Sequence, residues 1–216
     1  MPVRPDWQPL TLRAETLAIA RAGVAVLEGV NLAVTAGQAL VLTGPNGLGK
    51  TTLLRCLAGL QPSLRGKLHI PPDSWTYAGH TDGLKSVLTL AENLEFWAAV
   101  HGQTGVSAAM EAMNLTHLAA RRAAELSAGQ KRRLGLARLL VTGRWLWLLD
   151  EPTVSLDRDS VTLFGQVLRD HLATGGTAII ASHIDLGLPE AQVLDLTPYR
   201  ARDNAPSPGG FDEAFT

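Results

Sequence analysis

A glycine-rich loop lies between the apolar run of residues 39–42 and a helix-like stretch that follows it. The loop reads Gly44-Pro45-Asn46-Gly47-Leu48-Gly49-Lys50-Thr51-Thr52. Its glycines allow successive backbone N–H groups to turn inward around phosphate oxygens. Lys50 can reach the terminal phosphates, and the Thr51 hydroxyl can ligate Mg²⁺. A glycine-rich turn without a ligand would not need all these features, so the loop predicts a nucleoside triphosphate site.

The composition of the chain excludes several classes of protein that could contain such a loop. The 216 residues are enough for a single domain, and a net charge of -1 with 18% charged residues gives no basic face for nucleic acid. Cys56, the only cysteine, excludes an internal disulfide and a cysteine zinc cluster, and we expect it to pack in the helix after the loop. Residues 1–8 contain no export signal, and no run of about 18 apolar residues exists to span a bilayer.

Two kinds of strand are expected. Alternating residues at 16–19 and 27–34 predict an antiparallel pair joined through Ala22-Gly23 and followed by a turn at Ala36-Gly37. Continuous apolar runs predict parallel strands buried on both faces. These runs cover residues 39–43, 145–149 and 177–181, with one more strand at 193–196.

Residues 84–140 predict an inserted helical subdomain, with helices at 88–100, 106–113 and 128–140. Thr89 and Glu92 form a capping box for the first helix, and Gly102 ends it. We therefore expect one α/β domain over residues 1–216. Its core comprises about 10–83 and 141–197, and the Pro- and Gly-rich segment 202–216 is a flexible tail.

Two adjacent carboxylates, Asp150 and Glu151, end the apolar strand at 145–149. Adjacent strand residues point in different directions, so the two can take different roles. Asp150 can hold Mg²⁺ through a water, while Glu151 polarises an attacking water. This requires that both carboxylates lie across from the phosphate loop.

The segment Leu126-Ser127-Ala128-Gly129-Gln130 precedes a basic helix that begins Lys131-Arg132-Arg133. Ser127 can cap this helix and offer its hydroxyl to an anion. Together with the phosphate loop, Asp150-Glu151, Ser155-Leu156-Asp157 and His183, the segment resembles the ABC ATPase family. The resemblance covers about residues 17–196 and implies a P-loop NTPase fold with a RecA-like parallel sheet, a small antiparallel β subdomain and a helical insertion.

The resemblance also implies a role for each motif. Gly44 to Thr52 would be the Walker A loop, Asp150 the end of the Walker B strand, and Glu151 the catalytic base. Ser127, Ala128, Gly129 and Gln130 would be the signature motif, Ser155, Leu156 and Asp157 the D-loop, and His183 the switch histidine. ABC ATPases work as head-to-tail dimers with ATP and Mg²⁺ between the two copies.

The chain departs from the family pattern at three positions. Ala128 stands where the signature usually has glycine, and His80 stands at the usual place of the Q-loop glutamine, as a third catalytic candidate. Residues 18–23 contain no aromatic ring for adenine, so Arg21 is the only planar group there that could stack on the base.

Residues 77–85 and 88–97, the alanine in the signature and the tryptophans near 145–148 are similar to one subfamily: the ATP-binding subunit of the bacterial cytochrome c maturation haem exporter. This resemblance implies a peripheral subunit on the cytoplasmic face of the inner membrane, bound to separate membrane-spanning subunits. ATP hydrolysis would power haem export or the release of a haem-loaded periplasmic chaperone. The six histidines are scattered, so we do not expect haem to bind this chain directly.

A partner's coupling helix would then dock between residues 80–87 and 90–100, with Leu84, Val87, Phe96 and Trp97 as its apolar wall. Core packing of Phe96 or Trp97 is the alternative to this role. Three other functions stay open from the sequence: an ABC importer or other exporter, a soluble ABC ATPase acting on ribosomes or nucleic acid, and a subunit that binds ATP mainly as an assembly clamp.

Overall fold

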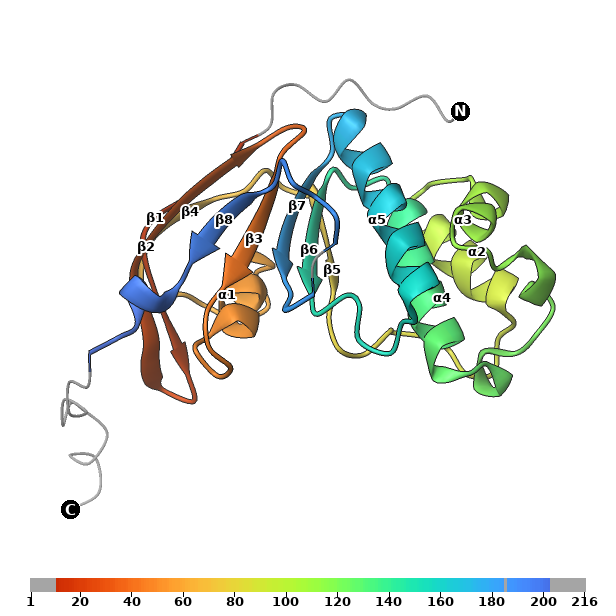
Figure 1. The fold of residues 1–216 in the computed structure, drawn as a ribbon, viewed down its shortest axis with the longest axis horizontal. Helices are drawn as coiled ribbons and strands as arrows, with labels where there is room; N and C mark the ends of the chain where they lie inside the picture. The colour runs from red at the N-terminus through yellow and green to blue at the C-terminus, as the bar shows by residue number, and fades with distance from the viewer. Residues whose placement is uncertain (1–10, 185, 203–216) are drawn as a thin grey trace, which may run out of the picture.

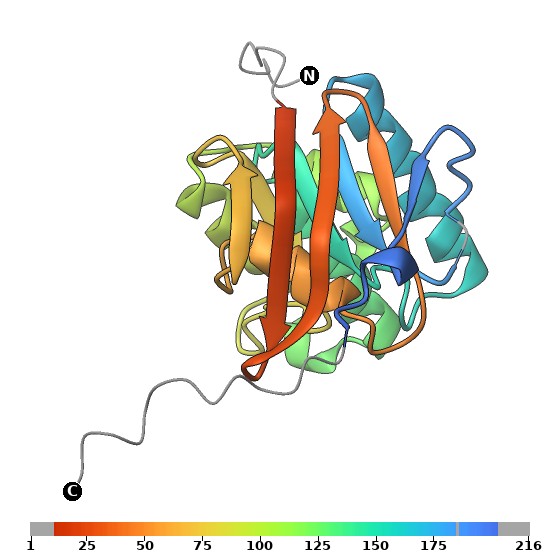
Figure 2. The ribbon, with the colours of Figure 1, turned by 90° about the vertical axis from the view of Figure 1, so that its left-hand side faces the viewer.

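The computed structural model describes residues 11–184 and 186–202, so the segment 203–216 of the expected tail lies outside the described residues. A three-stranded antiparallel sheet forms one side of the molecule (Figures 1 and 2). Its strands are β1 (Thr11–Arg21), β2 (Val24–Thr35) and β4 (Arg65–His69), in the order β2-β1-β4. The expected hairpin through Ala22 and Gly23 is confirmed, and both residues have positive φ.

A five-stranded parallel sheet lies beside it, in the order β5-β6-β7-β3-β8. The strands are β3 (Ala39–Thr43), β5 (Trp75–Ala78), β6 (Leu146–Asp150), β7 (Thr177–Ala181) and β8 (Gln192–Asp195). All four expected strands are present, but β8 is a mostly exposed edge strand and is not buried on both faces. The sequence patterns did not predict β4 or β5. The carboxyl ends of β3 and β6 lie on either side of β7, so the loops that follow them share one edge.

Helices cover both faces of the parallel sheet (Figure 1). Helix α1 (Lys50–Leu57) lies between the two sheets, and α5 (Arg158–Ala173) and α4 (Ala128–Leu140) cover the opposite face. Helices α2 (Leu90–Val100) and α3 (Val106–Ala112) pack beyond α4. Short 3₁₀ turns occupy Thr116–Leu118, Ala123–Glu125 and Thr197–Tyr199.

Local signals account for the ends of α2. Thr89 accepts from the Glu92 N–H and Glu92 accepts from the Thr89 N–H, so the expected capping box is confirmed. Helix α2 begins at Leu90 rather than at Leu88, because Thr89 is the cap and is extended. The helix ends before Gly102, whose φ of 63° suits a residue without a side chain.

The parallel sheet separates two hydrophobic clusters. Leu146 and Leu148 face the cluster under the antiparallel sheet, where Cys56 of α1 is also buried. Trp147 and Leu149, the alternate residues of β6, face the cluster formed with the helices. Alternation buries each side of the strand in a different core, and this is why β6 is apolar without interruption.

A pair of substitutions tests this packing. Phe164 is 0% exposed, so Phe164→Ala should lower the free energy of unfolding by about 3–5 kcal/mol through lost burial and the cavity that remains. Phe96 is 38% exposed, and Phe96→Ala should cost well under half as much. Denaturant titration of both variants measures the difference, and equal losses would contradict the assignment of Phe164 to the core.

Candidate functional site

The glycine-rich loop joins β3 to α1, and its backbone requires glycine at two positions in particular. A Cβ at Gly44 would lie 2.6 Å from Leu48 Cδ2, and Gly49 has φ 117° as it caps α1. No side chain caps this helix. Its first N–H groups therefore point toward the space above the loop, where the helix dipole favours an anion.

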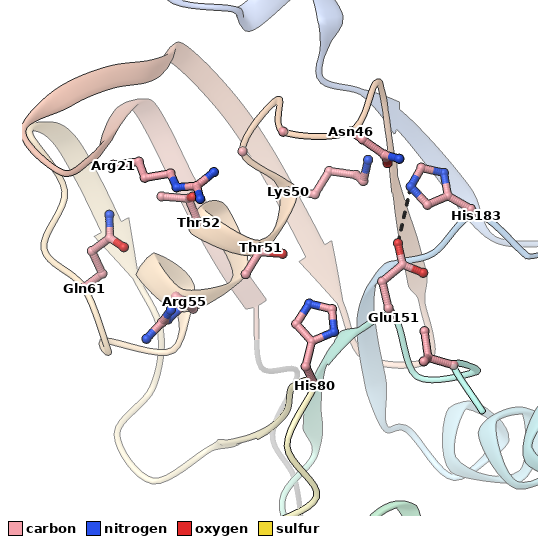
Figure 3. A pocket seen from close by; sticks show the side chains of 13 residues that line it. Arg21, Asn46, Lys50, Thr51, Thr52, Arg55, Gln61, His80, Glu151 and His183 are labelled. Carbon is pink, nitrogen blue, oxygen red and sulfur yellow. Dashed lines mark ion pairs between the residues drawn. The ribbon is translucent and has the colours of Figure 1, made fainter. Parts of the chain in front are cut away.

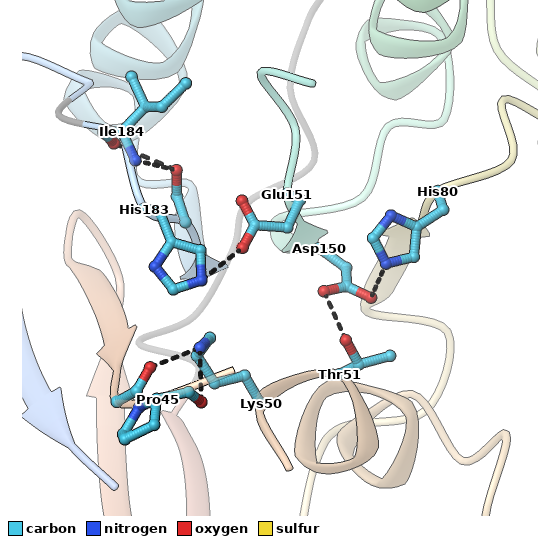
Figure 4. A network of polar contacts seen from close by, with 10 residues as sticks. Pro45, Lys50, Thr51, His80, Asp150, Glu151, His183 and Ile184 are labelled. Carbon is cyan, nitrogen blue, oxygen red and sulfur yellow. Dashed lines mark hydrogen bonds and ion pairs between the residues drawn. The ribbon is translucent and has the colours of Figure 1, made fainter. Parts of the chain in front are cut away.

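Lys50 is 8% exposed and begins α1. Its Nζ donates to the carbonyl oxygens of Gly44 at 2.6 Å and Pro45 at 3.2 Å (Figure 4). The ammonium is thus held directly over the loop. A third N–H remains to meet an anion in the loop, since an ammonium has three donors.

A cavity of about 620 Å³ opens over the loop (Figure 3). Its polar end is formed by Lys50, Glu151 and His183, with His80 and Thr51 beside them, and Arg21 lies at the other end. The structure therefore brings together sequence-predicted residues from five separate segments. The full lining consists of Arg21, Asn46, Gly47, Gly49, Lys50, Thr51, Thr52, Arg55, Gln61, His80, Glu151, Val154 and His183.

Asp150 is buried at the end of β6, with 1% of its side chain exposed. One carboxylate oxygen accepts from the Thr51 hydroxyl at 3.0 Å, and the other accepts from the Tyr77 hydroxyl at 3.1 Å. His80 Nε2 lies 3.7 Å from the same second oxygen (Figure 4). Burial, and then the charge of Asp150, raise the pKa of Tyr77, so this phenol keeps its proton and donates at neutral pH.

Glu151 points away from Asp150, as expected for adjacent residues at a strand end (Figure 4). Its Oε1 lies 3.4 Å from His183 Nε2 at the cavity. Its backbone N–H donates to the Ala181 carbonyl at 2.8 Å, although its φ is 48°. A non-glycine residue in this conformation is strained, and such strain persists only where the surroundings hold it.

Ser127 caps α4, as the sequence predicts. Its hydroxyl accepts from the Gln130 N–H at 3.2 Å, and Gln130 Oε1 accepts from the Ser127 N–H at 2.9 Å. Ser127 and Ala128 are both exposed, so the extra methyl of Ala128 points outward. Residues 127–130 do not line the cavity over the glycine-rich loop of their own chain.

The expected D-loop lies against this helix start. A Cβ at Gly129 would be 3.0 Å from the Ser155 carbonyl oxygen, and Leu156 packs against the helical-side core. Asp157 caps α5 by accepting from the Ser160 N–H at 2.8 Å, and hydrogen bonding with Ser160 lowers the pKa of Asp157. The residues predicted as signature and D-loop therefore lie side by side, and Val154 of the cavity lining directly precedes Ser155.

Sequence reasoning missed several residues at the site. Tyr77 binds Asp150 from β5, a strand that the patterns did not predict. Gln61 and Arg55 join Arg21 at the far end of the cavity, and Gln61 Nε2 donates to the Ala20 carbonyl. Arg132 is buried between Gly79 and Glu151. The run Lys131-Arg132-Arg133 signalled a basic helix but not which arginine points inward.

The single docking groove expected from the sequence is divided. Trp97 lines a cavity of about 520 Å³ with Leu60, Asp73, Trp75, Thr76, Tyr77, His101, Arg138, Thr142 and Arg144. Leu84 instead lines a separate cavity of about 480 Å³, and both Leu84 and Trp97 pack against the helical-side core. The guanidinium of Arg138 lies 4.7 Å from the Trp97 ring centre. The core-packing alternative is thus correct in part for Trp97.

Three or more His, Cys, Asp or Glu side chains are nowhere grouped as a metal centre within residues 11–184 and 186–202. Over the same residues, every helix is too short or too polar to cross a bilayer.

Residues 27–154 match the ABC transporter family. The cytochrome c biogenesis ATP-binding export protein CcmA of Paracoccus denitrificans is 62% identical over 206 residues, which cover 94% of this chain and 98% of that protein. The protein of the same name from Rhodobacter capsulatus is 60% identical, covering 94% of each chain.

Solved structures agree with the fold. An ATP-binding subunit of an ABC transporter aligns with a TM-score of 0.76 at 22% identity, over 86% of this chain and 85% of that one. A putative ABC transporter ATP-binding protein from Pyrococcus furiosus aligns with a TM-score of 0.77 at 21% identity, over 88% of this chain and all of that one. The expected arrangement of parallel core, antiparallel sheet and helical insertion is therefore confirmed.

The bond between Tyr77 and Asp150 can be tested through stability. Tyr77→Phe should lower the free energy of unfolding by about 1.5–3 kcal/mol, because a buried carboxylate loses a donor. Tyr199→Phe is the matched control, since Tyr199 packs partly buried against the same core cluster. Denaturant titration compares the two, and an equal effect would argue against a role for the Tyr77 hydroxyl at Asp150.

Proposed function

This chain belongs to the family of ABC transporter ATP-binding subunits, and we propose that it hydrolyses ATP to power a transporter complex for cytochrome c biogenesis. The observation that carries the proposal is the cavity over the phosphate loop, which gathers Lys50, Thr51, Glu151 and His183. The transported cargo would be haem, exported as such or released with its periplasmic chaperone, by analogy with the relatives named for cytochrome c biogenesis export.

Thr51 and Asp150 are the groups that would hold Mg²⁺. Their oxygens lie 3.0 Å apart, and hydroxyl and carboxylate oxygens are the hard donors that this ion prefers. An ion held there would supply positive charge to neutralise the phosphate oxygens. Tyr77 orients the Asp150 carboxylate from the opposite side.

The remaining residues act directly on the triphosphate and the water. Lys50 and the loop N–H groups bind phosphate oxygens, and Glu151 polarises the attacking water. His183, 3.4 Å from Glu151, contacts the γ-phosphate. His80, at the opposite side of Asp150 from Thr51, orients the water toward the phosphate. Arg21 stacks on the base at the far end of the cavity.

We further propose that two copies close around ATP. Ser127, Ala128, Gly129 and Gln130 lie outside the lining of their own chain's cavity, yet Ser127 and Ala128 are exposed at a helix start suited to an anion. The D-loop residues Ser155 to Asp157 extend the same surface. A second copy placed head to tail would bring this surface to the γ-phosphate. Hydrolysis would then release the pair, because only the triphosphate bridges both copies.

The cavity at Trp97 is the surface we assign to a membrane-spanning subunit. Its wall combines the rings of Trp75 and Trp97 with the guanidinium groups of Arg138 and Arg144. Arg144 already lies 3.6 Å from Asp73 of the same lining, so this chemistry fits a short helix that presents an apolar side chain to the two rings. The chain would thus lie peripherally on the cytoplasmic face of the inner membrane. Residues 84–140 would form one subdomain, and residues 10–83 with 141–197 the other.

Glu151→Gln tests whether turnover is the function. The substitution removes the base but keeps the size of the side chain, so ATP should hold the two copies together while hydrolysis falls by about 100-fold or more. Size-exclusion chromatography with ATP measures pairing, and c-type cytochrome accumulation in a complemented deletion strain measures function. Cytochromes formed normally by this variant would favour an assembly clamp instead.

Trp97→Ala tests the docking surface. The variant should bind ATP normally but lose most of its co-purification with the membrane-spanning subunits, because the cavity loses an aromatic wall. Phe96→Ala is the control, since Phe96 is the neighbouring aromatic residue and is not part of the lining. If only Phe96→Ala lost binding, that result would support the single docking groove predicted from the sequence.

A further inference from the structure

Arg132 is a buried arginine in the second turn of α4, and only 5% of the residue is exposed. Its Nη1 donates to the Gly79 carbonyl at 2.7 Å and to Asp82 Oδ1 at 2.9 Å. Its Nη2 donates to the Glu151 carbonyl at 2.8 Å, and its Nε to the Pro152 carbonyl at 2.9 Å. Four of the five guanidinium N–H groups are therefore used, and they reach two separate segments.

The first of these segments contains His80. Gly79 precedes His80 directly and Asp82 follows two residues later, so Arg132 binds on both sides of this histidine. Helix α4 also approaches closely here, because a Cβ at Gly135 would lie 2.8 Å from the Asp82 Cβ. The main chain that carries His80 is thus fixed to the helix.

The second segment is the turn after β6. Arg132 donates to the carbonyl oxygens of both Glu151 and Pro152. Glu151 is the residue with the strained backbone, since its φ is 48°. Two charge-assisted hydrogen bonds at this turn supply the restraint that such a conformation needs. The guanidinium therefore holds the backbone of Glu151 in the orientation that directs its carboxylate to the cavity.

We propose that Arg132 is a positioning residue that ties helix α4 to Glu151 and His80, so that the place of the helix sets the geometry of hydrolysis. Ser127, the N-cap of α4, lies five residues before Arg132, which is roughly 7 Å along the axis. When a second copy contacts Ser127, a shift of α4 would be transmitted through the Arg132 guanidinium to Glu151. The inference rests on the proposed ATPase function and assigns to it a residue outside the cavity lining.

Arg132→Lys is the test, because an ammonium keeps the charge but cannot span two segments as a planar fork does. In the full-length chain, kcat for ATP should fall by roughly 10- to 100-fold, with KM and the Kd for ATP changed less than about threefold. Arg133→Lys is the matched control in the same helix, since Arg133 binds the carbonyls of Met113 and Asn114. Its kcat should stay within about twofold of wild type.

Asp82→Asn provides a second variant if Arg132→Lys does not fold. It weakens one of the four contacts, so kcat should fall by about 3- to 10-fold at unchanged KM. The double variant should be no slower than Arg132→Lys alone, because both act through one guanidinium. Unchanged kcat in Asp82→Asn, or additive losses in the double variant, would overturn the inference.

Two further variants separate this inference from the proposed function. Lys50→Ala should abolish ATP binding, and Glu151→Gln should abolish turnover, whatever Arg132 does. If both retain wild-type turnover, the ATPase assignment itself is wrong. If both behave as expected while Arg132→Lys matches Arg133→Lys in kcat, only the positioning role fails.

Discussion

The hydrogen bond between Thr51 and Asp150 joins the two halves of the site. The two residues are 99 positions apart, and the carboxylate is almost fully buried. A buried charge is costly unless its oxygens are bonded, so Asp150 requires both Thr51 and Tyr77. The parallel pairing of β3 and β6 with β7 makes this contact possible, because it places the phosphate loop and the carboxylates at one sheet edge. The phosphate loop, Asp150 and Glu151 are all positioned from this edge.

Most of the site could be read from the sequence because its signals are local. The phosphate loop, the two carboxylates at the end of β6 and the cap at Ser127 each depend on residues within a few positions of one another. Apolar runs likewise predicted the three strands β3, β6 and β7, since two-sided burial leaves a continuous pattern. Strand β5 gave no such pattern, because Thr76 and Tyr77 interrupt it with polar groups and its alternate residues are only partly buried.

Arg132 shows why the remaining contacts could not be predicted. Its partners Glu151 and Gly79 lie 19 and 53 positions away, and nothing near Arg132 in the sequence distinguishes it from Arg133. Arg133 lies on the same helix and binds carbonyls of the helical insertion instead. Which arginine points inward depends on how α4 is rotated against the sheet, and this is a property of tertiary packing. The division of the expected docking groove into two cavities has the same origin.

Strand β6 contributes alternate residues to both hydrophobic clusters, with Trp147 on one face and Leu148 on the other. Loss of either cluster would expose one whole face of β6, the strand that ends in Asp150, to water. Neither half of the protein can then open while the other stays folded. We therefore expect heat or denaturant to disrupt both cores in a single cooperative transition, in which Asp150 loses its hydrogen-bond partners as β6 unfolds.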